Sequence, residues 1–142
     1  MKQKALKLIV FIVALLSMST VYAQTTSSNK ELVEVIYFHG KKRCVTCNAI
    51  EKLSQEVVNE QFSSQVADGT VVFKIVDITT KDGEALADHF EVAWSSLFVN
   101  KIEGRKEQVN DMTKFAFANA LNKPEEFKKG LTEKINGLLN GK

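Results

Sequence analysis

The chain has 142 residues, 19 of them basic and 17 acidic, which gives a formal net charge of +2 at neutral pH. Its first 23 residues hold three of the lysines and no acid, so residues 24–142 carry 16 basic against 17 acidic side chains, a net charge of −1. A nearly neutral chain of this length, without a basic stripe, predicts one domain with one core and argues against nucleic-acid binding.

Residues 1–23 have the pattern of a secretory signal peptide. Three lysines precede an unbroken apolar run from Leu8 to Leu16, and Val21-Tyr22-Ala23 supplies the small residues of a cleavage site before Gln24. The apolar run is too short to favour a membrane span, and an uncleaved N-terminal anchor is the alternative. We therefore expect an exported protein, periplasmic or secreted, whose cysteines work in an environment where disulfides persist.

A polar leader is expected over residues 24–31 and a single folded domain over residues 32–142. Leu32 to Phe38 is nearly continuous apolar sequence, which is typical of a strand buried on both faces in the middle of an α/β sheet. His39 to Arg43 then predicts a basic loop that contains one glycine.

The next segment predicts a helix, a second strand and a short helix. From Cys44 to about Val66 apolar residues recur every three to five positions, as in an amphipathic helix, and Asp68-Gly69 ends it with turn chemistry. Thr70 to Ile78 is rich in β-branched residues and predicts a second inner strand, adjacent and parallel to the first. Asp82 to His89 predicts a short helix.

The last third of the chain predicts a hairpin followed by two helices. Ser96–Asn100 and Arg105–Val109 are expected to pair as antiparallel strands. Asp111 or Thr113 can cap the first helix, and Pro124 suits the first turn of the second. The helical side chains expected in the core are Phe115, Phe117, Phe127, Leu131, Ile135 and Leu138. This order of elements predicts a three-layer α/β sandwich with a mixed sheet of about four strands.

Cys44 and Cys47 are the only two cysteines of the chain, and they stand at the predicted strand-to-helix turn. Free N–H groups and the positive end of the helix dipole stabilise a thiolate at such a position, so the pattern predicts thiol–disulfide exchange. Cys44 is expected to attack, and Cys47, one turn further on and less exposed, to resolve. The basic residues Lys41, Lys42 and Arg43 are expected to lower the pKa of Cys44 further and to make the pair more oxidising.

Two other interpretations of the cysteine pair stay open. An inert disulfide would gain little stability, because the loop that it closes is short. Metal binding would use Cys44, Cys47 and His39, which can hold a soft ion such as Cu(I) or form an incomplete zinc site. The alternative function is therefore a metal-carrying or partner-binding module.

A Cys-x-x-Cys after the first strand of this element order resembles the thioredoxin superfamily. The resemblance extends over Val72–Asp77, over Phe90–Val99 and to a hairpin glycine at Gly104, and FHGKKRCVTC is also similar to exported thioredoxin-like bacterial proteins. It implies a thioredoxin-like fold that acts on protein or small-molecule thiols and disulfides through a mixed disulfide. It also implies that no bound cofactor is required, that the protein is a monomer, and that a membrane redox protein is a candidate partner.

The chain departs from the family's pattern at three places. Ser96, or Ser95 if the alignment shifts by one, stands where the family has a cis-proline. A non-proline cis bond costs about 2.5–4 kcal/mol, so we expect a trans bond there and a reshaped groove. Tyr37 or Phe38 stands where the family has a buried acid, and Arg43 replaces the aromatic residue before the first cysteine. These changes argue against a general, fast protein-disulfide reductase.

Further candidate residues each have two interpretations. His39 can tune the thiolate or carry a proton during exchange, or it is an exposed loop residue. Trp94 can form part of a partner-binding patch, or it packs beside a core strand. The basic run Lys41–Arg43 can guide an acidic partner, or it is a solvated loop. His89 is expected on the surface with no functional role.

Overall fold

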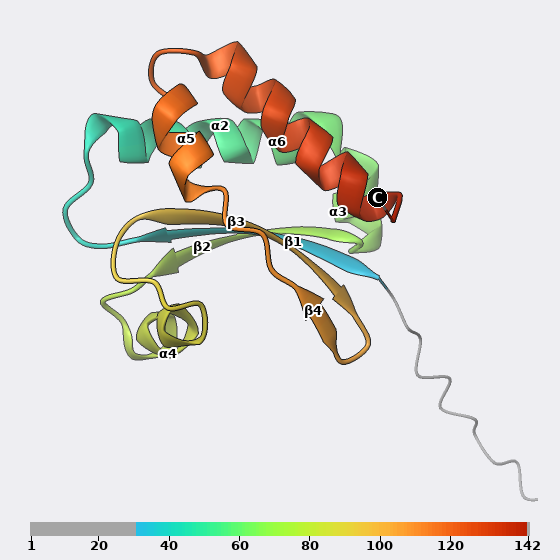
Figure 1. Cartoon of the computed structure of the whole chain (residues 1–142), viewed down its shortest axis with the longest axis horizontal. Coiled ribbons are helices and arrows are strands. Elements are labelled where there is room, and N and C mark those ends of the chain that lie inside the picture. Colours follow the sequence, from blue (N-terminus) through green and yellow to red (C-terminus); the bar gives the residue numbers. More distant parts are fainter. Residues whose placement is uncertain (1–30, 142) are drawn as a thin grey trace, which may run out of the picture.

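The computed structural model of this protein describes residues 31–141, which form a four-stranded mixed sheet with helices on both faces (Figure 1). The predicted signal peptide and residues 24–30 of the predicted leader lie outside the described residues. Each layer of the predicted α/β sandwich is present, which confirms the fold class.

The strand β1 (Leu32–His39) is the inner strand around which the sheet is built. It pairs in parallel with β2 (Val71–Asp77) and antiparallel with β3 (Ser96–Glu103), and β3 in turn pairs antiparallel with β4 (Lys106–Gln108). The strand order is therefore β2-β1-β3-β4. The predicted inner position of the first strand and the antiparallel hairpin are both confirmed.

The predicted inner position of Thr70–Ile78 is wrong, because β2 lies at an edge of the described sheet. Only Val71 is fully buried in this strand, and the Ile75 side chain is 44% exposed. A run of β-branched residues indicates that helices cover the faces of a strand. It does not indicate whether another strand pairs with each of its two edges.

Helices cover the sheet unequally. The long helices α2 (Val45–Gln61) and α6 (Pro124–Leu139) lie on one face together with the short α5 (Thr113–Asn119), whereas α4 (Lys81–His89) covers the opposite face (Figure 1). Pro124 occupies the first turn of α6, as predicted, where its missing N–H costs nothing. No helix among the residues that the structure describes is long and apolar enough to cross a membrane.

The strand β1 divides the core into two clusters because its side chains point alternately to the two faces of the sheet. Val33, Val35 and Tyr37 pack with α2, α5 and α6 in the larger cluster. Ile36 and Phe38 pack towards α4 in the smaller cluster. All five side chains are at most 1% exposed, so the end of β1 that leads into the cysteine loop is packed tightly on both faces.

The single helix predicted from Cys44 to Val66 is wrong at Phe62, where the chain breaks into α2 and α3 (Ser63–Asp68). Phe62 has a non-helical backbone, with φ −126° and ψ 25°, and its side chain is 2% exposed. Burial of this ring outweighs the continuation of the helix. Gly69 then ends α3 in the left-handed region, with φ 74°, as the predicted turn requires.

The predicted burial of Phe117 is also wrong, because this side chain is 38% exposed. Phe115 does face the core and stacks on Phe127 with ring centroids 6.1 Å apart. Positions two apart on a helix do not face the same way, so a helix as short as α5 cannot bury both rings. The predicted cap at Asp111 or Thr113 is also wrong, because Met112 occupies the cap position of α5 and no side chain caps the helix. The Asp111 carboxylate, one residue earlier, accepts the Thr113 N–H at 2.8 Å.

Candidate functional site

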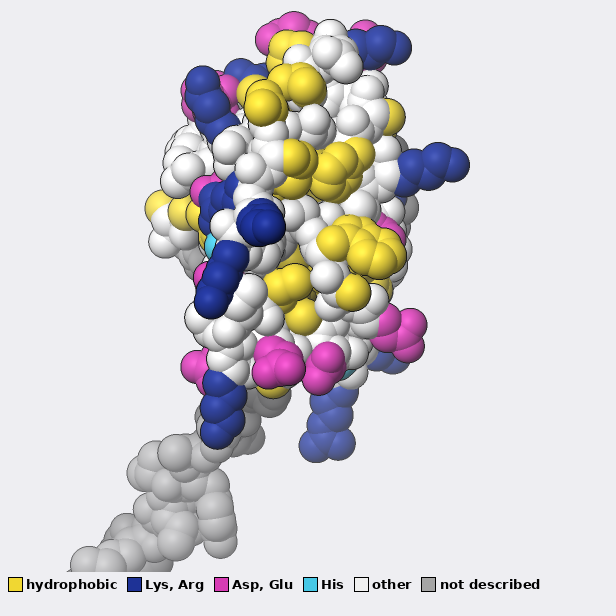
Figure 2. Space-filling view, turned by 90° about the vertical axis from the view of Figure 1, so that its left-hand side faces the viewer, with side chains coloured by type: hydrophobic (Ala, Val, Ile, Leu, Met, Phe, Trp, Pro, Cys, Tyr) yellow, Lys and Arg dark blue, Asp and Glu magenta, His cyan; other side chains and the backbone are white. Residues whose placement is uncertain are grey.

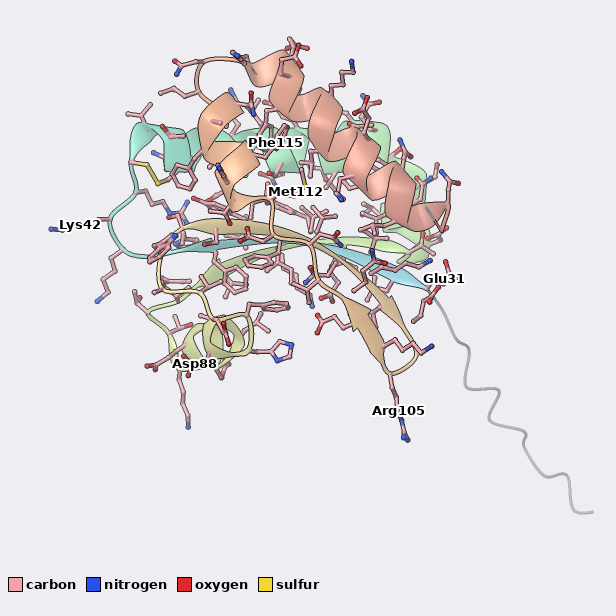
Figure 3. The ribbon with its side chains drawn as sticks, in the orientation of Figure 1. Glu31, Lys42, Asp88, Arg105, Met112 and Phe115 are labelled. Carbon is pink, nitrogen blue, oxygen red and sulfur yellow. A yellow bond between two sulfur atoms is a disulfide. The ribbon has the colours of Figure 1, made fainter. Side chains whose placement is uncertain are left out.

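The two cysteines form a disulfide at the start of α2, where the loop after β1 meets the helix (Figure 3). Cys44 is the residue that caps the helix, its backbone is extended, and its Cα lies 5.0 Å from that of Cys47. The Cys47 N–H donates to the Cys44 Sγ at 3.1 Å. Cys44 is exposed, whereas Cys47 is only 6% exposed, so an incoming sulfur can reach Cys44 alone.

The helix that Cys44 caps favours a negative charge on its sulfur. The helix α2 is 17 residues long and has no acidic residue in its first turn. The unpaired N–H groups of that turn and the helix dipole both stabilise a thiolate, and no nearby carboxylate of the same turn opposes them. In the reduced protein the pKa of Cys44 is therefore expected below that of a free thiol, about 8.5.

The three cations of the basic loop before Cys44 have different surroundings. Lys41 and Lys42 are exposed, and Lys42 extends away from the loop (Figure 3). The Arg43 guanidinium turns back towards α2 and forms an ion pair with the Glu51 carboxylate. Arg43 is thus compensated by a carboxylate that sequence reasoning did not place at the site.

The alternation of side chains along β1 decides which of Tyr37 and Phe38 lies behind the cysteines. Phe38 faces α4, so Tyr37 lies behind the cysteines, where its hydroxyl donates to the Cys47 carbonyl oxygen at 2.9 Å. Burial raises the pKa of Tyr37, and a hydrogen bond with the Ser95 side chain lowers it by a smaller amount. A buried, neutral phenol therefore occupies the position that the resemblance assigns to a carboxylate.

His39 is not an exposed loop residue, because it is the last residue of β1 and only 8% exposed. Its ring stacks on that of Tyr37 with centroids 6.1 Å apart, and its Nδ1 lies 3.2 Å from the Gly40 carbonyl oxygen. Within residues 31–141, no three His, Cys, Asp or Glu side chains gather where they could hold a metal ion. The structure therefore does not bring His39 together with Cys44 and Cys47 as a ligand set.

The loop that faces the disulfide presents Trp94 and Ser95 rather than Ser96. An open groove of about 510 Å³ runs between this loop and the cysteines. The residues that line it are Gly40, Lys42, Cys44, Cys47, Ile78, Ala93, Trp94, Ser95 and Phe117. Ser96 lies behind them, and its hydroxyl donates to the Trp94 carbonyl oxygen at 3.1 Å. All peptide bonds of the described residues are trans, as expected for this loop.

Three exposed hydrophobic side chains stand next to the disulfide and form what we call the apolar rim: Val45, Trp94 and Phe117. Trp94 is 69% exposed, so the interpretation as core packing is wrong. Figure 2 shows hydrophobic side chains gathered in the middle of the face that carries the β1–α2 loop, with lysine or arginine side chains around them. Large apolar side chains that are exposed close together are typical of binding surfaces.

His89 lies outside this site, as predicted. It is exposed at the end of α4, and its Nε2 lies 3.0 Å from the Glu107 carboxylate of β4.

The sequence matches no protein-family model and no curated protein. Among solved structures, the chain is similar to a thioredoxin from Thermus thermophilus, with 17% identity, a TM-score of 0.48, and coverage of 78% of this chain and 80% of that one. It is similar to human ERp44 in a zinc-bound form, with 14% identity, a TM-score of 0.47, and coverage of 76% of this chain and 27% of that one. It is also similar to a malarial protein, with 17% identity, a TM-score of 0.41, and coverage of 61% and 93%.

The fold is thioredoxin-like, and its assignment rests on topology. A parallel β1–α2–β2 unit is followed by α4 on the other face, by an antiparallel β3–β4 hairpin and by a last helix beside α2. The cysteine pair lies at the end of the inner strand β1, where the first helix begins. Thiol–disulfide redox chemistry is the function that this combination of fold and motif suggests.

Proposed function

We propose that this protein is an exported thiol–disulfide exchange protein that uses Cys44 and Cys47 on protein or small-thiol partners. The observation that carries the proposal is the asymmetry of the pair. Cys44 caps α2 in contact with solvent, and Cys47 is buried behind it. A disulfide that only stabilises the fold does not require one exposed and one buried sulfur. Thiol–disulfide exchange does require an accessible sulfur that is attacked and a protected sulfur that resolves the mixed disulfide.

The reaction runs in two displacements. In the reduced protein the Cys44 thiolate attacks one sulfur of a partner disulfide, a mixed disulfide forms, and the second partner sulfur leaves as a thiolate that takes a proton from water. Cys47 then loses its proton and attacks the Cys44 sulfur, which closes the intramolecular disulfide and releases the first partner sulfur. Two electrons pass from the cysteine pair to the partner, so no bound cofactor is required. The opposite direction follows the same steps in reverse.

The groove and the apolar rim support a protein partner. A partner segment that brings its sulfur to Cys44 must pass Trp94 and Phe117, whose exposed faces favour apolar neighbours. Lys41 and Lys42 belong to the loop that leads to Cys44, and both are exposed. Hydrogen bonds lower the pKa of Asp77 at the end of β2, and the charge of Lys41 also helps to lower it. We propose that the two lysines favour partners with acidic residues beside the reactive sulfur.

Replacement of Lys41 and Lys42 by glutamine tests this preference. The double variant should react more slowly with a disulfide peptide that carries flanking glutamates, and the difference should shrink as salt rises, because exposed charges are screened. A matched peptide with flanking glutamines is the control. Equal loss of rate with both peptides would contradict electrostatic guidance.

Export to the periplasm or beyond the cell is proposed from residues 1–23, and a membrane redox protein is the corresponding candidate partner. The mature protein should then begin at Gln24 and act as a monomer. Intact mass of the exported protein and its elution in size-exclusion chromatography test both statements. A mass that includes residues 1–23 would favour an N-terminal anchor instead.

Equilibration of the purified mature protein in glutathione buffers of graded potential tests the proposed chemistry. The fraction of protected thiols would be read as mass added by alkylation, and metal content would be measured on the same sample. A single reversible two-electron transition supports exchange. Stoichiometric copper or zinc that masks both thiols would instead favour the metal-carrying alternative, and a disulfide that resists every buffer would favour an inert bond.

A further inference from the structure

Arg43 and Glu51, which stand on either side of the Cys44–Cys47 motif in the sequence, form an ion pair. Arg43 directly precedes Cys44, and Glu51 follows Cys47 by four residues, so it stands one turn further along the same side of α2. The two side chains are 29% and 22% exposed, and the guanidinium meets the carboxylate. The side chain that sequence places beside the attacking sulfur is therefore drawn along the helix, away from its N-terminus.

The electrostatic influences on Tyr37 indicate that the Arg43–Glu51 ion pair lies near the buried side of the cysteine motif. Burial raises the pKa of Tyr37, and among the smaller influences the charge of Arg43 lowers it and that of Glu51 raises it. Because the Tyr37 hydroxyl donates to the Cys47 carbonyl oxygen, both charges lie within electrostatic reach of the buried half of the site. Of the three basic residues of the loop, Lys41 and Lys42 are therefore the two that stay unpaired with Glu51 on the exposed side of the site, where Cys44 lies.

Resting on the proposed exchange function, we propose that Glu51 is a positioning residue of the redox pair. It holds Arg43 against the second turn of α2, withholds that positive charge from the Cys44 thiolate, and so keeps the Cys44–Cys47 disulfide harder to reduce.

The position of Glu51 and the charge of Arg43 explain why the ion pair should make the disulfide harder to reduce. Glu51 is the first carboxylate of α2 and stands seven residues after Cys44, about 10 Å along the helix axis. The guanidinium of Arg43 contacts this carboxylate, so the carboxylate offsets its positive charge, and exposed charges this far along the helix are also screened by salt. A released Arg43 would join Lys41 and Lys42 beside the helix N-terminus. A better stabilised thiolate stabilises the reduced form, which shifts the equilibrium from disulfide towards dithiol.

The sharpest test compares Glu51→Gln, Arg43→Gln and the double variant with the unchanged protein. Two readouts are needed: the pH dependence of Cys44 alkylation in the reduced protein, located by mass, and the equilibrium constant with glutathione. We expect Glu51→Gln to lower the apparent pKa of Cys44 and to shift the equilibrium towards the dithiol by about two- to fivefold, the range for one exposed charge pair. Arg43→Gln should shift both in the opposite direction, and the double variant should lie between the single variants.

Glu56→Gln is the matched control. Glu56 is another carboxylate of α2, and it pairs with Lys128 of α6 at 2.7 Å, away from the cysteine loop. This variant makes the same chemical change in the same helix and should leave both readouts unchanged. The shift caused by Glu51→Gln should also fade at 1 M salt, where the Debye length is about 3 Å.

Two results would overturn the inference. If Glu51→Gln raises the pKa of Cys44, the pinned Arg43 is itself the counter-ion of the thiolate, and if the variant changes neither readout, the ion pair is only structural. Failure of the proposed function looks different, because the unchanged protein would then show no reversible equilibrium with glutathione. The alkylation profile still decides the role of Glu51 in that case, since it needs only the reduced protein.

Discussion

Replacing Tyr37 by phenylalanine removes one hydroxyl from the most enclosed polar contact of the site. That hydroxyl is fully buried and donates to the Cys47 carbonyl oxygen at 2.9 Å, with the Ser95 side chain as a second neighbour. Loss of one buried hydrogen bond costs about 1 kcal/mol, and the penalty of leaving its partners less well satisfied brings the expected loss to about 1–2 kcal/mol. For a domain of this size the melting temperature should fall by about 4 °C for each kcal/mol.

Urea unfolding of the oxidised protein at neutral pH measures this loss directly. The midpoint should fall while the slope of the free energy of unfolding against urea stays constant, because the surface exposed on unfolding does not change. Ser95→Ala and the double variant complete a double-mutant cycle, in which the two effects should not add, because the Ser95 side chain is hydrogen-bonded to the Tyr37 hydroxyl. An unchanged midpoint for Tyr37→Phe would refute the hydrogen bond as a source of stability.

The pH dependence of the same variant is an independent check on the site. Burial raises the pKa of Tyr37 in the folded protein above its unfolded value of about 10, so the unfolded chain loses this proton first. The resulting stability is present below pH 10 and is lost as pH rises through the folded-state pKa. Tyr37→Phe should lack this alkaline loss, whereas an identical alkaline profile would place the Tyr37 hydroxyl in contact with solvent.

Two further predictions follow from the cysteines and from one glycine. Cys44→Ser should abolish exchange, and Cys47→Ser should leave a reactive thiol that accumulates mixed disulfides; a Cys47 that alkylates faster than Cys44 near neutral pH would reverse the proposed roles. Gly83→Ala should destabilise the fold by about 1–3 kcal/mol in urea unfolding, because a Cβ there would collide with a backbone carbonyl at the end of β2, whereas Gly40→Ala, with open space around it, should cost far less.

Local patterns predict most of the elements and the chemistry of the site, because these depend on neighbours in the sequence. The continuous apolar run of β1 follows from burial on both faces, and the stripe of α6 follows from one buried face. The exposed Cys44 and the shielded Cys47 follow from a helix that begins within the motif, with Cys44 as its cap and Cys47 in its first turn. The errors occur where a distant contact decides, as with the burial of Phe62 and the exposure of Phe117.

By itself the sequence determined that two cysteines stand at a strand-to-helix turn of an α/β domain, since spacing and periodicity are local properties of the chain. Only the tertiary structure decided which charges act on them. It put Tyr37 rather than Phe38 behind Cys47 through the alternation of β1, and it turned Arg43 towards Glu51 along the flank of α2. The sequence states which residues carry a charge. The effect of a charge depends on its distance from other groups, and these distances are set only when the strand and the helix pack together.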